Sequence, residues 1–159
     1  MLTEKDYCDY DTCVALKESG YKVPTSAYYI SNDTTLYFVS NPFRGGYAID
    51  CFYSHNSLRE GVVTRNYIDA PTMWEAQKWL RKEKQMLVSP LIFADNLIDE
   101  DGKIVDRWKY YSFAIYSTST AEFIRNYDQG EEYESYEEAL LEGIKEAIKL
   151  FKECENTED

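Results

Sequence analysis

The segment SYEEALLEGIKEAIKLF, residues 135–151, carries the clearest structural signal in this chain. Ser135 can cap a helix, and Glu138, three residues later, can accept a hydrogen bond from the Ser135 N–H, which makes a capping box. Apolar residues then recur at helical spacing, as Leu140, Ile144, Ala147, Ile148 and Phe151. Such a stripe is typical of a helix that packs on a sheet. The segment therefore predicts an amphipathic helix over residues 136–152.

A second helix is predicted over residues 73–85. Thr72 and Glu75 form another capping box at its start. Its apolar residues also recur at helical spacing, as Met73, Ala76, Trp79 and Leu80. Its cations gather toward the C-terminal end, where the helix dipole favours them, so a solvated basic face explains them without a binding role.

A short leading helix and a series of strands complete the pattern. Asp9 or Asp11 can cap a helix over residues 11–19, and Gly20 supplies the left-handed residue that ends it. Runs rich in β-branched and aromatic residues predict strands at 27–30, 36–39, 47–53, 62–67, 86–93 and 108–116. Pro90 keeps the 86–93 strand at a sheet edge or breaks it. Asp101-Gly102 predicts a hairpin turn before the 108–116 strand.

These elements predict an α+β fold. We expect a mainly antiparallel sheet of about five to seven strands, with the 73–85 and 136–152 helices on one face and the short N-terminal helix closing an edge. The length of 159 residues suits a single domain. The polar residues 154–159 are expected to form a frayed tail.

Charge and hydropathy argue against two classes of function, nucleic-acid binding and membrane insertion. The formal net charge is −12, and residues 126–159 hold −9 of it, from twelve Asp and Glu against three Lys. Direct nucleic-acid binding needs Lys and Arg to neutralise phosphates, so it is not expected. No run approaches the roughly 18 apolar residues of a membrane span, and no signal peptide opens the chain. We expect a cytoplasmic protein with reduced cysteines and no membrane contact.

The patterns of known catalytic and metal sites are missing from the sequence. His55 is the only histidine, which excludes sites that need two imidazoles. No nucleophile motif surrounds any Ser or Cys. Cys8 and Cys13 lack the spacing of a zinc pair, and a calcium loop built around Gly102 would place Trp108 at its last ligand position. We expect a non-catalytic protein without a metal or cofactor.

An acidic surface is the first candidate site. Its residues are Glu131, Glu132, Glu134, Glu137 and Glu138. A dense carboxylate surface can dock a basic protein. Acidic residues near a helix N-terminus also stabilise the helix dipole and keep a protein soluble, so a purely structural role is the alternative.

A small-ligand or nucleotide site is a second candidate, because aromatic residues make up 16% of the chain. Rings can stack on a ligand, and arginines can bind its anionic groups. The candidate residues are Arg44, Trp108, Tyr110, Tyr111 and Arg125. A third hypothesis is an enzyme whose site follows none of the known motifs.

Three segments also carry a resemblance to known proteins. They are residues 12–20 (TCVALKESG), 67–82 (YIDAPTMWEAQKWLRK) and 133–150 (YESYEEALLEGIKEAIKL). Together they resemble a group of small proteins, without assigned activity, that phages, prophages and mobile elements of Bacteroides-type gut bacteria encode. This resemblance implies an accessory protein in the host cytoplasm. We expect it to bind a host protein as a defence inhibitor or regulator.

Overall fold

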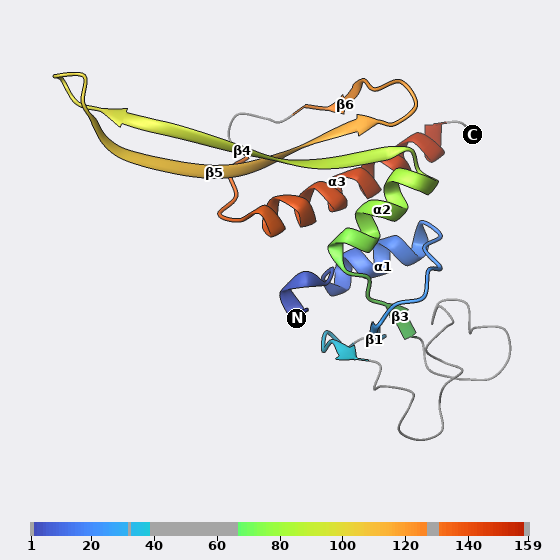
Figure 1. The fold of residues 1–159 in the computed structure, drawn as a ribbon. Coiled ribbons are helices and arrows are strands. Elements are labelled where there is room, and N and C mark those ends of the chain that lie inside the picture. The colour runs from blue at the N-terminus through green and yellow to red at the C-terminus, as the bar shows by residue number, and fades with distance from the viewer. Residues whose placement is uncertain (1, 32, 39–66, 127–130, 158–159) are drawn as a thin grey trace, which may run out of the picture. The chain divides into compact units, whose positions relative to one another are not determined.

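The computed structural model describes residues 2–31, 33–38, 67–126 and 131–157 (Figure 1). The helices in this part of the chain are η1 (Glu4–Asp6), α1 (Tyr10–Glu18), α2 (Met73–Glu83) and α3 (Tyr136–Thr157). The strands are β1 (Ala27–Ile30), β2 (Tyr37–Phe38), β3 (Tyr67–Asp69), β4 (Met86–Ile98), β5 (Ile104–Ser117) and β6 (Phe123–Arg125). The predicted α+β class and the antiparallel strand pairing are confirmed.

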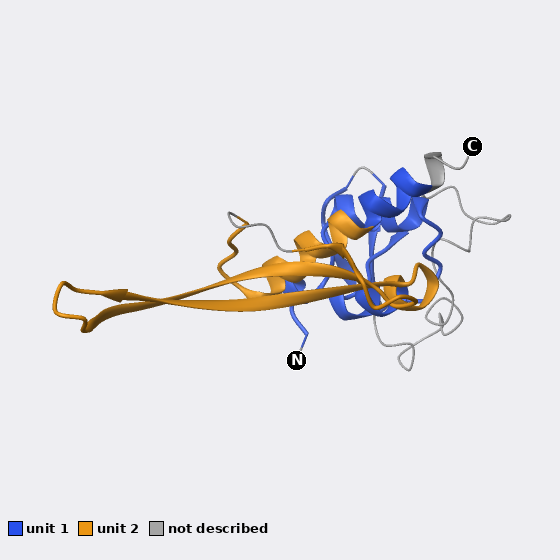
Figure 2. Ribbon diagram, turned by 90° about the horizontal axis from the view of Figure 1, so that it is seen from above, with its two compact units in different colours: residues 1–79, 148–159 blue, residues 80–147 orange. Residues whose placement is uncertain are grey.

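The strands form two sheets, so the expectation of one sheet is wrong. The first has the order β2-β1-β3 and the second the order β4-β5-β6, and every pairing is antiparallel. The chain divides into two compact units, residues 1–79 with 148–159 and residues 80–147, and each unit contains one sheet (Figure 2). Strand propensity reports local conformation and not the partner of a strand, which explains the error.

Local capping signals organise the first unit. Asp9 caps α1 by accepting a hydrogen bond of 2.9 Å from the Thr12 N–H. Gly20, with φ of 92°, ends the helix, and the Gly20 and Tyr21 N–H groups donate back to Lys17 and Leu16. At the start of α2, the Glu75 carboxylate accepts from the Thr72 N–H at 2.8 Å. The predicted caps of these two helices are therefore confirmed.

The core of the first unit joins α1, the N-terminal turns of α2 and the small sheet. Its buried apolar side chains include Cys8, Cys13, Leu16, Tyr21, Ile68, Met73, Ala76 and Trp79. The Tyr21 and Trp79 rings meet edge to face, with centroids 5.5 Å apart. The Lys17 ammonium donates to the Tyr67 carbonyl at 2.9 Å, which fastens α1 to β3.

The second unit consists of β4, β5 and β6 with the N-terminal part of α3. This part of α3 packs closely on the sheet at Gly143, where a Cβ atom would lie 2.5 Å from Val88 Cγ1 and 3.1 Å from the Phe113 ring. Leu140 and Ile144, two residues of the predicted apolar stripe, are fully buried. The stripe thus faces inward, as its spacing predicts.

The β4–β5 turn confirms the predicted hairpin. The Gly102 N–H donates to the Asp99 carbonyl at 3.0 Å, and Gly102 has a φ of 78° that favours glycine. The Asp99 carboxylate accepts from the Asp101 and Lys103 N–H groups at 3.1 and 2.8 Å. The side chain of Asp99 therefore closes the turn.

Several element bounds differ from the expectations. Helix α1 covers residues 10–18, and α2 ends at Glu83, shortly before Gln85 with its φ of 55°. Helix α3 continues to Thr157, into the segment expected to fray. Strand β4 runs through Pro90 and continues to Ile98, well past the expected end at residue 93.

Some expectations fall outside the described residues. The 47–53 strand lies there, as does most of the 62–67 strand, of which Tyr67 begins β3. Among the helices that the structure describes, none has the length and apolar character needed to cross a membrane.

Candidate docking surface on the β4–β5 arm

Strands β4 and β5 form a long hairpin that extends beyond the part of α3 in the same unit (Figure 2). The two strands pair from Met86 with Ser117 to Ile98 with Ile104, with one bulge at Leu97 and Ile98. The inner part of the hairpin is buried around Val88 and Phe113, whereas most side chains beyond residue 91 are exposed. We call residues 91–110 the distal arm.

The distal arm exposes large apolar side chains. Six of them are between 41% and 62% exposed, namely Ile92, Leu97, Ile98, Ile104, Val105 and Trp108. All six belong to one hairpin, so they are concentrated on one element and are not scattered singly over the surface. A concentration of exposed apolar side chains on one element indicates an interaction site.

The strand register assigns these side chains to two faces. Directly opposed residues share a face, and neighbours along a strand alternate. The face that contacts α3 through Val88 and Phe113 continues outward, and we call it the helix-side face. On the distal arm it consists of Ile92, Ala94, Asn96, Arg107 and Lys109.

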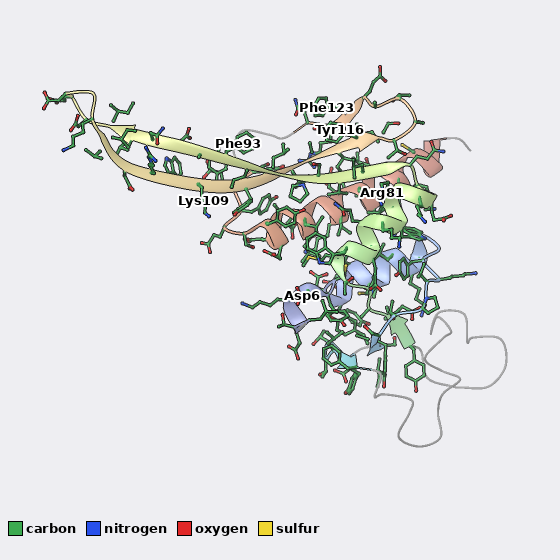
Figure 3. All side chains as sticks on the ribbon, in the orientation of Figure 1. Asp6, Arg81, Phe93, Lys109, Tyr116 and Phe123 are labelled. Atoms are coloured by element: carbon green, nitrogen blue, oxygen red, sulfur yellow. The ribbon has the colours of Figure 1, made fainter. Side chains whose placement is uncertain are left out.

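The opposite face is aromatic and acidic, and we call it the aromatic face. It consists of Phe93, Asp95, Leu97, Asp106, Trp108 and Tyr110. Phe93 and Tyr110 stack with ring centroids 5.2 Å apart, and Trp108 lies 5.8 Å from Tyr110. Figure 3 labels Phe93 and Lys109, which belong to the two different faces. The cations and the anions of the paired arm strands are therefore separated by face.

The residues of the predicted ligand site are distributed over several places. Trp108 and Tyr110 share the aromatic face, whereas Tyr111 lies on the opposite face, with its ring 6.5 Å from that of Tyr136 at the start of α3. Arg125 lies in β6, and Arg44 is outside the described residues. A ligand at Trp108 and Tyr110 stays a prediction.

The five glutamates of the predicted acidic surface have different surroundings. Glu131 pairs with Arg125, and the Glu138 carboxylate accepts from the Glu134 N–H at 3.1 Å. The Ser135 hydroxyl accepts from the Glu138 N–H, which confirms half of the predicted capping box. Glu132, Glu134, Glu137 and Glu138 are exposed. At least two of the five side chains thus have a structural role, in an ion pair or in a cap.

Arg125 holds a small charged cluster at the base of the sheet. Its guanidinium contacts Glu131 at 2.5 Å and Glu146 at 2.7 Å, and it lies over the Phe113 ring at 5.3 Å. Burial raises the pKa of the nearby Tyr133 hydroxyl, and the carboxylate of Glu131 adds to this effect. The cluster joins β5, β6 and α3 within the second unit.

Replacing Arg125 with methionine should lower the free energy of unfolding by about 1–2 kcal/mol, because the change leaves two carboxylates without their cation while keeping most of the apolar stem. One Glu131 oxygen is buried without a hydrogen bond from any described residue, so it cannot turn to water without rearrangement. Urea unfolding followed by circular dichroism measures the change.

Arg125→Lys is the matched control for this variant. It keeps the charge but loses the planar fork that contacts both carboxylates, so it should cost less than the methionine variant. A methionine variant with wild-type stability would show that the cluster contributes nothing to folding.

Cys13 of α1 lies in an environment that does not favour a reactive thiolate. Cys13 is fully buried, and burial raises the pKa of its thiol well above the ordinary value. Its Sγ lies 3.5 Å from the Cys8 carbonyl oxygen, as suits the predicted core residue of the first helix. No group of three or more metal-ligating side chains occurs among the described residues. His55 lies outside them.

The apolar residues of the distal arm are absent from the predicted sites. The predicted strands end at residue 93 and begin again at 108, so Leu97, Ile98 and Val105 fall between them, whereas in the structure they belong to β4 and β5. The run LIFADNLI, residues 91–98, was a usable signal, since it contains one charge and no glycine or proline.

Searches of family models, curated proteins and solved structures found no match to this chain.

Proposed function

We propose that this is a non-catalytic binding protein that docks on another protein through its distal arm. The observation that carries the proposal is the cluster of half-exposed apolar side chains on one hairpin. Exposing such side chains to water is unfavourable, so burying them against a partner would favour association.

The composition of the aromatic face supports the proposal. Trp and Tyr are enriched among the residues that dominate binding energy, and Trp108 and Tyr110 stand next to each other on this face. Trp108 is 51% exposed, so about half of its large surface is available to a partner. Leu97 lies on the same face nearer the tip.

The backbone pairing of the arm supports the proposal as well. The ladder between β4 and β5 is continuous apart from a bulge at Leu97 and Ile98, and the Phe93 and Tyr110 rings stack across it. The base is anchored by the fully buried Val88 and by Phe113. A preformed arm loses little conformational entropy on docking, so more of the contact energy appears as affinity.

The charge of the chain favours a basic partner. The net charge is −12, and Glu132, Glu134 and Glu137 are exposed near the start of α3. Carboxylates of this kind accelerate encounter with a basic protein, while the apolar arm supplies the lasting contact. In line with the resemblance described above, we propose that the partner is a bacterial host protein that this chain inhibits or regulates.

Site-specific photo-crosslinking tests the proposal. With the photoreactive p-benzoylphenylalanine at Leu97, irradiation in a host-cell lysate should give a discrete product that contains a second protein, identified by mass spectrometry. Adding Trp108→Ala should reduce its yield at least about tenfold, as the loss of a central aromatic contact predicts. Raising the salt concentration should also reduce the yield, because it screens the charges that speed encounter.

Val23 provides the matched control position. It is 43% exposed and lies in the first unit, so the same photoreactive residue there should give no such product. Equal labelling from both positions, or none from Leu97, would contradict docking through the arm. Glu132, Glu134 and Glu137 changed together to glutamine should weaken the salt dependence without abolishing capture.

A further inference from the structure

The outer edges of β4 and β5 differ in how they are protected against pairing with a further strand. The Tyr111 N–H and carbonyl both bond to Tyr133, at 3.0 and 2.8 Å, so they point away from β4. In an antiparallel ladder, residues whose groups point to the partner alternate with residues whose groups point away. Ile92, opposite Tyr111, therefore points its N–H and carbonyl outward, and the alternation continues along the arm.

On β4 this alternation places Pro90, Ile92, Ala94, Asn96 and Ile98 at the outward positions. Proline lacks an N–H, and its place in an edge strand with the nitrogen facing out agrees with this assignment. From Ile92 to Ile98 the outward residues are uncharged and include no proline. Strand β4 is an edge strand in the sheet that the structure describes.

On β5 the corresponding outward residues of the distal arm are Arg107 and Lys109. Outward cations are a standard protection of a sheet edge against pairing with another strand, as is proline. The β5 edge is thus protected by charge and the inner β4 edge by Pro90, while the outward residues of β4 from Ile92 to Ile98 have neither. An unprotected apolar edge strand is a site for strand addition.

We propose that a second copy of this chain pairs antiparallel with β4 along residues 91–98 and forms a two-fold symmetric dimer. This inference is independent of the proposed function, because edge pairing leaves the aromatic face of each arm open to a partner. Symmetric pairing requires the edge to complement itself. The sequence LIFADNLI meets this requirement in one particular register.

That register is centred on Asp95. It places Ile92 opposite Ile98 and Phe93 opposite Leu97, so that the large apolar side chains meet each other. The outward residues exchange about eight backbone hydrogen bonds. A register centred on Ala94 would place Pro90 opposite Ile98, and the missing N–H of Pro90 would remove a backbone hydrogen bond at each end of the paired segment. Registers centred beyond Asp95 would shorten the paired length of the two strands. Pro90 therefore selects the register.

The size of the surface suits a reversible dimer. Pairing along residues 91–98 covers the β4 edge and leaves most of the exposed apolar side chains of the two faces open, so it buries less than the roughly 800 Å² per partner of a standard interface. The paired segment carries a single charge, so little repulsion arises within it even though the whole chain is strongly negative. The two Asp95 carboxylates face each other at the centre and oppose the association.

Analytical ultracentrifugation over a concentration series tests the dimer. The average mass should rise from 18.6 kDa toward twice that value. Asp95→Asn should tighten association about fivefold, since it removes the like-charge pair. Asp95→Lys should associate weakly with itself but form mixed dimers with the wild-type chain. A mass that stays at the monomer value, or an asparagine variant that associates no more tightly, would overturn the proposal.

Ala94→Pro tests the edge itself. It removes an outward N–H that β5 does not use, so the hairpin keeps its ladder while dimerisation is lost. Lys109→Pro is the matched control, because it makes the same change on the β5 edge and should leave the dimer intact. Equal effects of the two prolines would overturn pairing through β4. Circular dichroism verifies folding, and the Asp95 variants decide the matter if either proline variant fails to fold.

Discussion

Replacing Gly143 with valine is expected to lower the free energy of unfolding by about 3 kcal/mol. A Cβ atom at this position would lie 2.5 Å from Val88 Cγ1, closer than two carbon atoms can approach. Val88 is fully buried and stiff at χ1, and the buried Phe113 ring also lies only 3.1 Å from the Cβ position, so neither neighbour can move aside easily. Urea unfolding followed by circular dichroism provides the measurement.

Two further variants separate this clash from the effect of valine on the helix. Glu137→Val places the same residue at an exposed position of α3 and should cost less than about 1 kcal/mol. In a Gly143→Ala background, shortening Val88 to alanine should recover part of the lost stability. If Gly143→Val unfolds at the wild-type urea concentration, α3 does not pack on β4 as closely as described.

The helices could be predicted because their signals are local. The N-cap at Asp9, the capping box of Thr72 and Glu75, and the left-handed Gly20 are each read from a few neighbouring residues, and each is present in the structure. Within α2, the stripe of apolar residues predicted the buried side, and Trp79 lies in it. Such features need no knowledge of the tertiary fold.

The division into two sheets could not be predicted from the same signals. Strand pairing is set by contacts between residues far apart in sequence, such as Tyr28 with Asp69. Composition identifies a strand but does not name its neighbour. The strand-like runs therefore predicted one sheet, although β1 pairs with β2 and β3 while β4, β5 and β6 form a sheet of their own.

The distal arm was missed for a related reason. Asp95 and Asn96 belong to residue types that are depleted in strands, and they directly follow the predicted strand end at residue 93. In the structure Asp95 sits opposite Trp108 in the ladder, where an exposed hairpin tolerates a polar residue. The average β-propensity of these polar residues is low, but the distal part of β4 keeps its strand conformation because it pairs with β5 along the hairpin.

Charge alone does not show which residues of the acidic surface already have partners within the chain. Twelve acidic residues after residue 125 suggested a surface, but composition cannot show that Glu131 pairs with Arg125 or that Glu138 accepts a backbone N–H. Arg125 was placed in a ligand site for its charge, whereas the structure places its guanidinium between two carboxylates and over a ring. Pairing in three dimensions decides which charges stay available.

Phe113 contacts both α3 and the charged cluster around Arg125. Phe113→Ala should lower the free energy of unfolding by about 3–5 kcal/mol. Its ring is 2% exposed and touches the Gly143 position, and it lies near the Tyr133 ring and under Arg125. Truncation leaves a cavity that a glycine on α3 cannot fill, and it removes the surface on which the guanidinium rests. The midpoint and slope of urea unfolding measure the loss.

Phe113→Leu separates packing from ring chemistry. It keeps most of the volume and should cost about 1 kcal/mol. Combining it with Arg125→Met gives a double-mutant cycle, in which a coupling of about 0.5–1 kcal/mol would show that the cation rests on the ring face. If alanine costs no more than leucine, the site collapses around the missing ring. The base of the arm would then be too soft to hold the distal arm in one direction, and a stiff docking hairpin would lose its physical basis.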